Sequence, residues 1–208
     1  MRWIGALLLA LAVLLGALWV LNPGGVFNRY KNLSQVTVTV SDPIFENIWR
    51  EAPQVIEGKM QILGHAVPHV YVWLTVQLHD IDCEWHTVFE NRQFDLVALA
   101  QREENVTVNL EADNYDTLQL TVHRMLIVVE TPLGATVEIE PAVANLVIPL
   151  PLHFAPEAGG AYQIVVDFSA AESIIDIDVD GRTADVEIKC VVAHREAGKS
   201  WSEIITGP

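Results

Sequence analysis

The stretch Val70-Tyr-Val-Trp-Leu-Thr-Val-Gln-Leu78 decides the fold class of this chain. Its aliphatic residues alternate with other side chains, and a period of two residues places them all on one face of an extended strand. Strand-like patterns recur along the rest of the chain, at 36–40, 94–98, 117–129, 162–168, 174–179 and 184–192. Many short strands separated by turn residues predict an all-β, antiparallel sandwich or barrel, and of these we expect the β-sandwich.

Turn residues and prolines define three further elements. Thr131-Pro132-Leu133-Gly134 separates two strand-like runs, which predicts a hairpin of 126–130 with 136–140. The segment Asn145–Leu152 is apolar but holds two prolines, so we expect an edge strand or a loop there. Asp42-Pro43 has the form of a helix N-cap followed by a first-turn proline. It predicts a short helical insertion that ends by Pro53, with one apolar face made of Ile44, Phe45, Ile48 and Trp49.

The charged residues are concentrated in the part of the chain from Asp42 to Pro208, called the body below. All 27 acidic residues occur from Asp42 onward together with nine of the 12 basic ones, so these 167 residues carry a net charge of −18. Nucleic-acid binding requires a basic surface, and this balance therefore excludes it. The richness in valine, isoleucine and leucine excludes a disordered chain, and the length is that of one domain.

A separate apolar segment precedes the body. The 19 uncharged residues Trp3–Leu21 would span about 28 Å as a helix, close to the hydrocarbon thickness of a membrane. Trp3 and Trp19 stand near its ends, where aromatic side chains favour the membrane interface. A cleaved signal peptide is the alternative, but the segment ends in bulky rather than small side chains. We expect an uncleaved signal-anchor over 1–22 that binds membrane lipid.

The anchor determines the expected organisation of the rest. A linker over 23–35 leads to the β-sandwich domain over 36–193, and a C-terminal tail occupies 194–208. Two N-x-S/T sequons, at Asn32 and Asn105, and the secreted character of the body favour a location outside the cell, with both asparagines as glycosylation candidates. We therefore expect a single-pass protein of the cell membrane whose β domain is extracytoplasmic.

Several of these stretches together resemble a known family. The likeness is greatest over Glu157–Ser173, which combines a glycine-rich turn, a strand and an Asp-Phe-x-x-x-x-Ser pattern, and it extends to 36–43, 70–88, 94–99 and 116–122. These patterns are similar to the prokaryotic family of domains of unknown function DUF4382, over 36–192 with 44–64 as an insertion. The resemblance implies a sandwich of the transthyretin or carboxypeptidase-regulatory kind on membrane- or lipid-anchored surface proteins. It implies no catalytic residues.

One group of acidic residues has the spacing of a calcium loop of the EF-hand type: Asp176, Asp178, Asp180 and Glu187. The aliphatic residues on both sides of Asp180-Gly181 alternate, however, which predicts a β-hairpin whose Asp-Gly tip suits positive φ. Carboxylates on one face of a strand lie about 7 Å apart, too far to share one ion. We expect the hairpin, with a weak cation site at its tip as the alternative.

Potential metal ligands are densest between residues 79 and 86. His79, Asp82 and His86 are the candidates there, beside Asp80 and Cys83, and solvated loop residues are the alternative. The pair His65 and His69 is separated by a proline, which rules out the helical spacing of a zinc protease. The sequence has no nucleophile elbow and no phosphate-binding glycine loop, so we expect neither an enzyme nor a bound cofactor.

Two alternatives remain open for Cys83 and Cys190. An oxidising compartment and a pair of cysteines favour a disulfide. Cys190 falls on the inward face of its strand while Cys83 is out of phase with the strand before it, which favours two free thiols.

Three functions are compatible with these features. The first is a non-catalytic, surface-exposed domain with a protein-binding or structural role, whose partners lie in the same membrane or on the cell surface. Asn145–Leu152 is the candidate contact segment. The second is an accessory single-span subunit of a larger integral membrane complex. The third is a metal-dependent enzyme at His79–His86. We expect the first.

Overall fold

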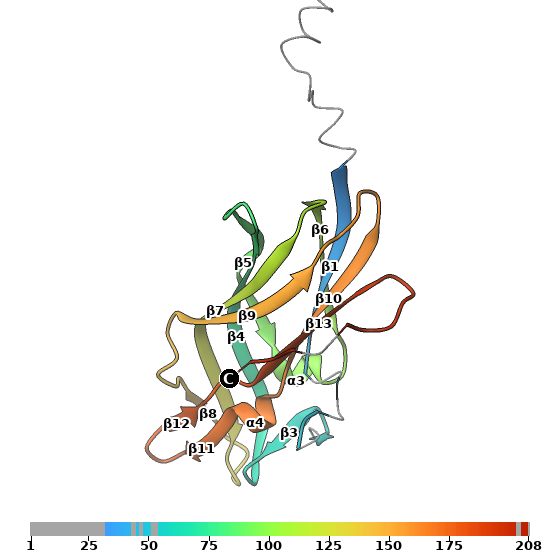
Figure 1. Cartoon of the computed structure of the whole chain (residues 1–208). Coiled ribbons are helices and arrows are strands. Elements are labelled where there is room, and N and C mark those ends of the chain that lie inside the picture. Colours follow the sequence, from blue (N-terminus) through green and yellow to red (C-terminus); the bar gives the residue numbers. More distant parts are fainter. Residues whose placement is uncertain (1–31, 43–44, 46–47, 51–53, 203–204, 208) are drawn as a thin grey trace, which may run out of the picture.

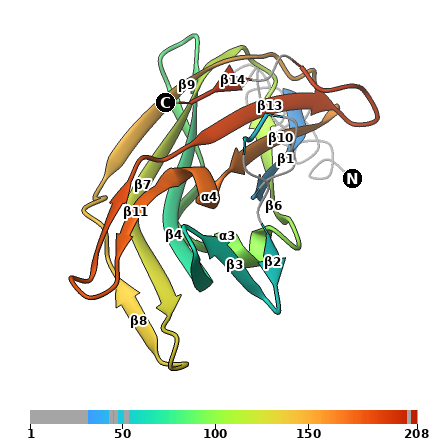
Figure 2. The same ribbon diagram turned by 90° about the horizontal axis from the view of Figure 1, so that it is seen from below.

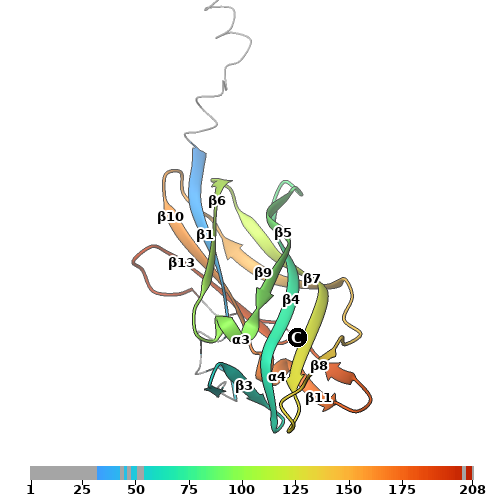
Figure 3. The ribbon, with the colours of Figure 1, turned by 180° about the vertical axis from the view of Figure 1, so that it is seen from behind.

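Two β-sheets and one separate hairpin make up the part of the chain that the computed structural model describes, residues 32–42, 45, 48–50, 54–202 and 205–207. The five-stranded and the seven-stranded sheet lie on opposite sides of the domain (Figures 1 and 3). All but one of the strand pairings are antiparallel, so the expected all-β, antiparallel class is confirmed.

The five-stranded sheet contains the only parallel pair among the described strands. Its order is β14 (Ile205–Thr206), β13 (Cys190–Glu196), β10 (Ala161–Phe168), β1 (Leu33–Ser41) and β6 (Glu104–Glu111). β1 and β10 run parallel, and the remaining neighbours are antiparallel. The residues expected as a C-terminal tail, 194–208, thus supply the end of β13 and the edge strand β14.

The seven-stranded sheet is built on two 16-residue strands, β4 (His65–Asp80) and β7 (Tyr115–Glu130). On the far side of β4 lie β3 (Lys59–Ile62), which pairs with β2 (Val55–Ile56), and β5 (Trp85–Asp95). On the far side of β7 lie β8 (Thr136–Ile139) and β9 (Leu146–Phe154). The predicted hairpin around Thr131–Gly134 is confirmed, and Asn145–Leu152 forms most of the edge strand β9.

The core lies between the two sheets and follows the alternation in the sequence. The five aliphatic residues from Val70 to Leu78 are each at most 1% exposed, as the pattern predicts. Alternate residues of β1, from Val36 to Val40, belong to the same cluster from the opposite sheet. Each fully buried aliphatic side chain of this kind contributes about 2 kcal/mol to folding, which makes this shared core the main source of stability.

One short helix replaces part of a predicted strand, and a second lies between two predicted strands. The strand expected over 94–98 ends at Asp95, whose side chain accepts a hydrogen bond from Val97 N and caps helix α3 (Leu96–Leu99). Helix α4 (Ala170–Ser173) follows β10 and is capped by Ser169. The run predicted as one strand over 184–192 is split into β12 (Thr183–Val186) and β13. Short apolar runs have no distinct period, so alternation could not separate these outcomes.

The β11–β12 hairpin pairs β11 (Ile174–Asp178) with β12 around the predicted tip. Two details differ from the prediction. A register shift between Ile174 and Asp176 leaves Ile175 50% exposed, and the positive φ occurs at Arg182 rather than at Gly181. Instead, Gly181 N donates to Asp178 Oδ1, and a Cβ at Gly181 would meet that carboxylate at 2.4 Å, so a larger residue there would displace the Asp178 side chain.

Loops at one end of the sandwich surround the start of β1 (Figure 1). Ala112 N donates to Asn32 O, Gly159 N donates to Leu33 O, and Ile81 N donates to Asn114 O, so the loops at 81–84, 112–114 and 157–160 share this end. The β7–β8 turn and the β11–β12 hairpin lie at the opposite end (Figures 1 and 2). Any segment that precedes residue 32 therefore enters the domain at the end with the 81–84 loop.

Two predicted helices fall wholly or largely outside the described residues. The expected anchor, 1–22, lies outside them, and within them no helix is both long and apolar enough to cross a membrane. Most of the helix expected after Asp42 also lies outside, and its described part has a turn in which Ile48 N donates to Phe45 O. The Asp42 carboxylate accepts hydrogen bonds from Ala170 N, the first residue of α4.

Candidate functional site

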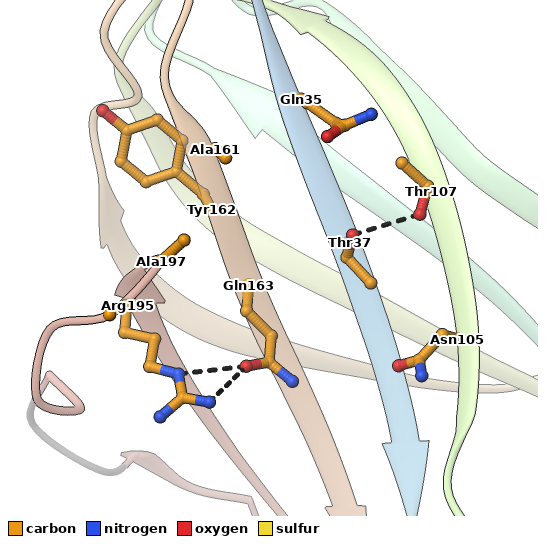
Figure 4. Close-up of a pocket in the computed structure, with 10 residues that line it drawn as sticks. Gln35, Thr37, Asn105, Thr107, Ala161, Tyr162, Gln163, Arg195 and Ala197 are labelled. Atoms are coloured by element: carbon orange, nitrogen blue, oxygen red, sulfur yellow. Dashed lines mark hydrogen bonds between the residues drawn. The ribbon is translucent and has the colours of Figure 1, made fainter.

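A shallow groove crosses the outer face of the five-stranded sheet, from β6 over β1 and β10 to β13 (Figure 4). Its volume is about 480 Å³. No acidic residue is found among the described residues that line it, although the body carries a net charge of −18. Its polar side chains are amides, hydroxyls and one guanidinium: Gln35, Thr37, Asn105, Thr107, Gln163 and Arg195.

Strand register places four of these side chains in one row. Thr37 of β1 stands opposite Thr107 of β6 on one side and Gln163 of β10 on the other, and Gln163 stands opposite Arg195 of β13. All four point away from the core, because their neighbours on β1 and β10, Val36, Val38 and Ile164, point into it. At about 4.8 Å between strands, the row is roughly 14 Å long.

A relay of hydrogen bonds runs from Arg195 through Gln163 to Thr39 and Asn105 in the next row of outward side chains. It fixes the orientation of both amides. Arg195 donates from Nε and Nη2 to Gln163 Oε1, at 3.0 and 2.8 Å, and a guanidinium has donors only. Gln163 Nε2 must then face Thr39 Oγ1, at 2.9 Å, and Thr39 donates to Asn105 Oδ1 at 2.6 Å. The carbonyl oxygens of both amides are engaged within this relay. Asn105 Nδ2 and the remaining N–H groups of Arg195 are left as donors at the groove.

The other half of the same sheet face, toward Ser41 and Asp167, is covered by other segments of the chain. Val165, Val191 and Ala193 form a second apolar cluster there with Phe45, against which Ile48, Trp49 and Trp201 pack. The Arg195 guanidinium lies 4.0 Å from the centre of the Trp201 ring and so joins the covered half to the groove.

A buried carboxylate holds this cover in place. Asp167 is completely buried and accepts from Ser41 Oγ at 2.6 Å, Phe45 N at 2.9 Å and Trp49 Nε1 at 3.1 Å. Asp42, also buried, lies near enough for the charge of Asp167 to affect it. Burial raises the pKa of Asp42 well above its usual value, and the charge of Asp167 raises it further.

The metal candidates between residues 79 and 86 are only partly brought together. His79 pairs with Asp116 at 2.9 Å and contacts the Trp85 ring, while Asp82 is exposed. The potential ligands that do converge are Asp80, Glu84 and His86. Asp80 already accepts from Glu84 N at 2.8 Å and lies 2.6 Å from His86 Nε2, so its carboxylate closes the β4–β5 turn. The hydrogen bond from His86 is the main reason that the pKa of Asp80 is lowered.

The four acidic residues with calcium-loop spacing do not converge. Asp176, Asp178, Asp180 and Glu187 are all exposed on and after the hairpin, and they are not among the described groups whose ligand atoms could share an ion. Asp178 instead accepts from Gly181 N within the turn. The hairpin predicted from the alternation is therefore what these residues form.

The cysteines and sequons have defined environments. Cys83 and Cys190 are free thiols: Cys83 is exposed in the β4–β5 turn, and Cys190 is buried in β13. Burial raises the pKa of the Cys190 thiol to about 12, which makes it unreactive at neutral pH. Asn32 is exposed just before β1, and Asn105 is exposed on β6 with its Oδ1 engaged by Thr39.

The predicted contact segment is partly in the core and partly exposed. Ile148, Leu150 and Leu152 of β9 are at most 2% exposed. Leu146 and Val147 are 41% and 50% exposed, and Pro149 and Pro151 are exposed beside them. β9 pairs only with β7 among the described strands, and residues 205–207 lie beside it, so its exposed apolar surface consists of Leu146, Val147, Pro149 and Pro151.

Sequence reasoning missed the groove. Its signal was the polar half of the alternation, Gln35-x-Thr37-x-Thr39 in one strand and Gln163 in another, which reads as an ordinary solvated face. Only the pairing of β1 with β6 and β10 brings these side chains together, and none of that pairing is local in sequence.

Comparison with known proteins supports the fold at the level of a family. No curated protein and no solved structure matches the chain. The match to a family covers residues 30–184, about three quarters of the chain, so it includes every strand from β1 to β11. The chain therefore belongs to the DUF4382 family, which is described as a domain of unknown function.

Proposed function

We propose that the protein is a membrane-tethered domain at the cell surface with a protein-binding or structural role, and that it contacts partners in the same membrane through β9. The observation that carries this proposal is the group of exposed apolar side chains on β9, namely Leu146, Val147, Pro149 and Pro151. Pro149 and Pro151 have no N–H to donate to a partner strand, so the contact would be made by the apolar side chains rather than by backbone pairing. The net charge of −18 on residues 42–208 would attract a basic partner and repel an acidic one.

The described end of the domain supports the tether. The apolar segment Trp3–Leu21 leads into β1, at the end where the 81–84 loop lies. Ile81 and Trp85 are 57% and 45% exposed at that end. Isolated apolar side chains of this kind, tryptophan above all, are favoured at the interface of a membrane. A domain held by a short linker would present this end to the lipid surface.

Labelling of Cys83 tests the orientation, because it is the exposed thiol and Cys190 is buried. A membrane-impermeant maleimide should modify the full-length protein in intact cells as fully as after lysis. The variant Cys83→Ser should remain unlabelled in both. Labelling that appears only after lysis would place the body inside and contradict the proposal.

Photo-crosslinking tests the contact. A photoreactive residue at Val147 should give one discrete protein adduct in native membranes. The matched control is Ile175, which is equally exposed, at 50%, but lies on the β11–β12 hairpin. The β9 contact is contradicted when position 147 gives no adduct or the same adducts as position 175.

A further inference from the structure

We infer that the groove on the five-stranded sheet is a binding site for a neutral, hydroxyl-rich oligosaccharide. This inference is independent of the proposed contact at β9, which lies on the other sheet. It rests on the row Thr107, Thr37, Gln163 and Arg195, on the relay behind that row, and on the dimensions of the groove.

The shape of the groove fits an extended ligand. It crosses four strands, and its row of polar side chains is about 14 Å long. The volume of about 480 Å³ lies within the usual range for organic ligands, and the groove is open rather than enclosed. An open, elongated groove suits a chain of several rings better than a single small molecule.

The chemistry of the lining selects the class of ligand. Amides, hydroxyls and a guanidinium are donors and acceptors for sugar hydroxyls, and the apolar part of the lining, which includes Ala161, Tyr162 and Ala197, can contact the C–H faces of sugar rings. An extended peptide binds by adding a strand to a sheet edge, whereas this groove lies on the face of paired strands. A polyanion would be repelled by the charge of −18 on the body.

The relay prepares the groove for ligand oxygens. Because Arg195 fixes Gln163 and Gln163 fixes Thr39, the Asn105 amide is oriented before any ligand arrives. Its Nδ2 and the remaining N–H groups of Arg195 are donors to hydroxyl and ring oxygens. The hydroxyls of Thr37 and Thr107 lie 3.1 Å apart and can each donate or accept, as the alternating hydroxyls of a sugar require. Such preorganisation lowers the entropy lost on binding.

Titration calorimetry of the full-length protein in detergent with three neutral hexasaccharides tests the site. The probes are hexamers of α-1,4-linked glucose, β-1,4-linked glucose and β-1,4-linked N-acetylglucosamine. We expect at least one to bind with a Kd of about 1 mM or lower. No binding of any hexamer at about 10 mM would overturn the proposal. So would tighter binding of a galacturonate hexamer or of a hexaglutamate peptide than of every neutral probe.

Two variants locate the binding. Arg195→Met should weaken it at least tenfold, and Thr37→Val, which keeps the shape of the side chain, should weaken it about threefold. The matched control is Arg124→Met: Arg124 also stacks on a tryptophan, with its guanidinium 5.0 Å from the Trp73 ring, but on the other sheet. It should leave the affinity within about twofold. Equal losses in Arg195→Met and Arg124→Met, or unchanged binding in both groove variants, would overturn the assignment.

Discussion

The two halves of one sheet face differ sharply, although the same three strands build both. In the open half, the outward side chains are Thr37, Gln163 and Arg195, and they line the groove. In the covered half, one or two rows further along, they are Val165, Asp167 and Val191, and all are fully buried. The difference arises because Phe45, Trp49 and Trp201 pack over the second half alone. A sheet face is therefore open or closed according to segments that are remote in the sequence.

The covered half should depend most on Asp167. We expect Asp167→Ala to lower the free energy of unfolding by about 3 kcal/mol, because Ser41 Oγ, Phe45 N and Trp49 Nε1 would lose a buried acceptor. Chemical denaturation of the full-length protein in detergent measures this. Asp176→Ala, at an exposed aspartate, is the control and should change stability by less than about 0.5 kcal/mol. A similar small loss in both would show that the cover contributes little.

Trp201 should have the next largest effect. Its ring packs edge-on against Phe45, with centroids 5.5 Å apart, and lies under the Arg195 guanidinium. Trp201→Ala should cost about 2 kcal/mol, from lost apolar burial and lost ring contacts. Trp85→Ala, which removes a 45% exposed tryptophan from the other sheet, should cost under about 1 kcal/mol. Equal losses would mean that Trp201 does not act as part of a cover.

These differences mark the limits of what the sequence could predict. Alternation found the core strands β4, β7 and β10 because a two-residue period is local and needs no partner. It gave no reason for Val165-Val166-Asp167 to be buried without interruption, since the cover on the outer face comes from 45–49 and from Trp201. The groove escaped for the same reason: its four-strand row exists only through the register of β6, β1, β10 and β13. At 176–187 the local alternation was sufficient: it predicted a hairpin against the calcium-loop spacing, and a hairpin is what these residues form.

The buried Asp42 should make the stability of the protein depend on pH. Burial raises its pKa in the folded protein above the unfolded value of about 3.9, so the folded state binds a proton more readily than the unfolded state. Ionised Asp42 therefore destabilises the folded protein at pH values above its folded pKa. This destabilisation disappears as the pH falls toward the pKa of Asp42 in the unfolded chain. The prediction is that wild type gains stability relative to Asp42→Asn when the pH is lowered from 7 to about 4.

Unfolding of both proteins by urea at several pH values tests this difference. The comparison cancels the titrating groups that do not interact with Asp42, such as Asp80 and Glu140, whose lowered pKa values act with the opposite sign. A constant difference between the two proteins across this range would mean that burial does not raise the pKa of Asp42.

The open half should tolerate change, and this is the smallest effect that we predict. Thr37 points into the groove, where its hydroxyl lies 3.1 Å from that of Thr107, and solvent can replace this contact. Thr37→Val keeps the β-branched shape that suits a central strand, so the free energy of unfolding should change by less than about 0.5 kcal/mol.

The matched substitution in the covered half is Thr39→Val. Thr39 is fully buried and links Gln163 to Asn105, so its loss leaves both amides without their shared partner and should cost about 1.5 kcal/mol. The two side chains are adjacent outward residues of one strand, and urea unfolding of the pair isolates the effect of the cover. If both variants lose the same stability, the relay is solvated like the groove, and the boundary between the two halves lies beyond Thr39.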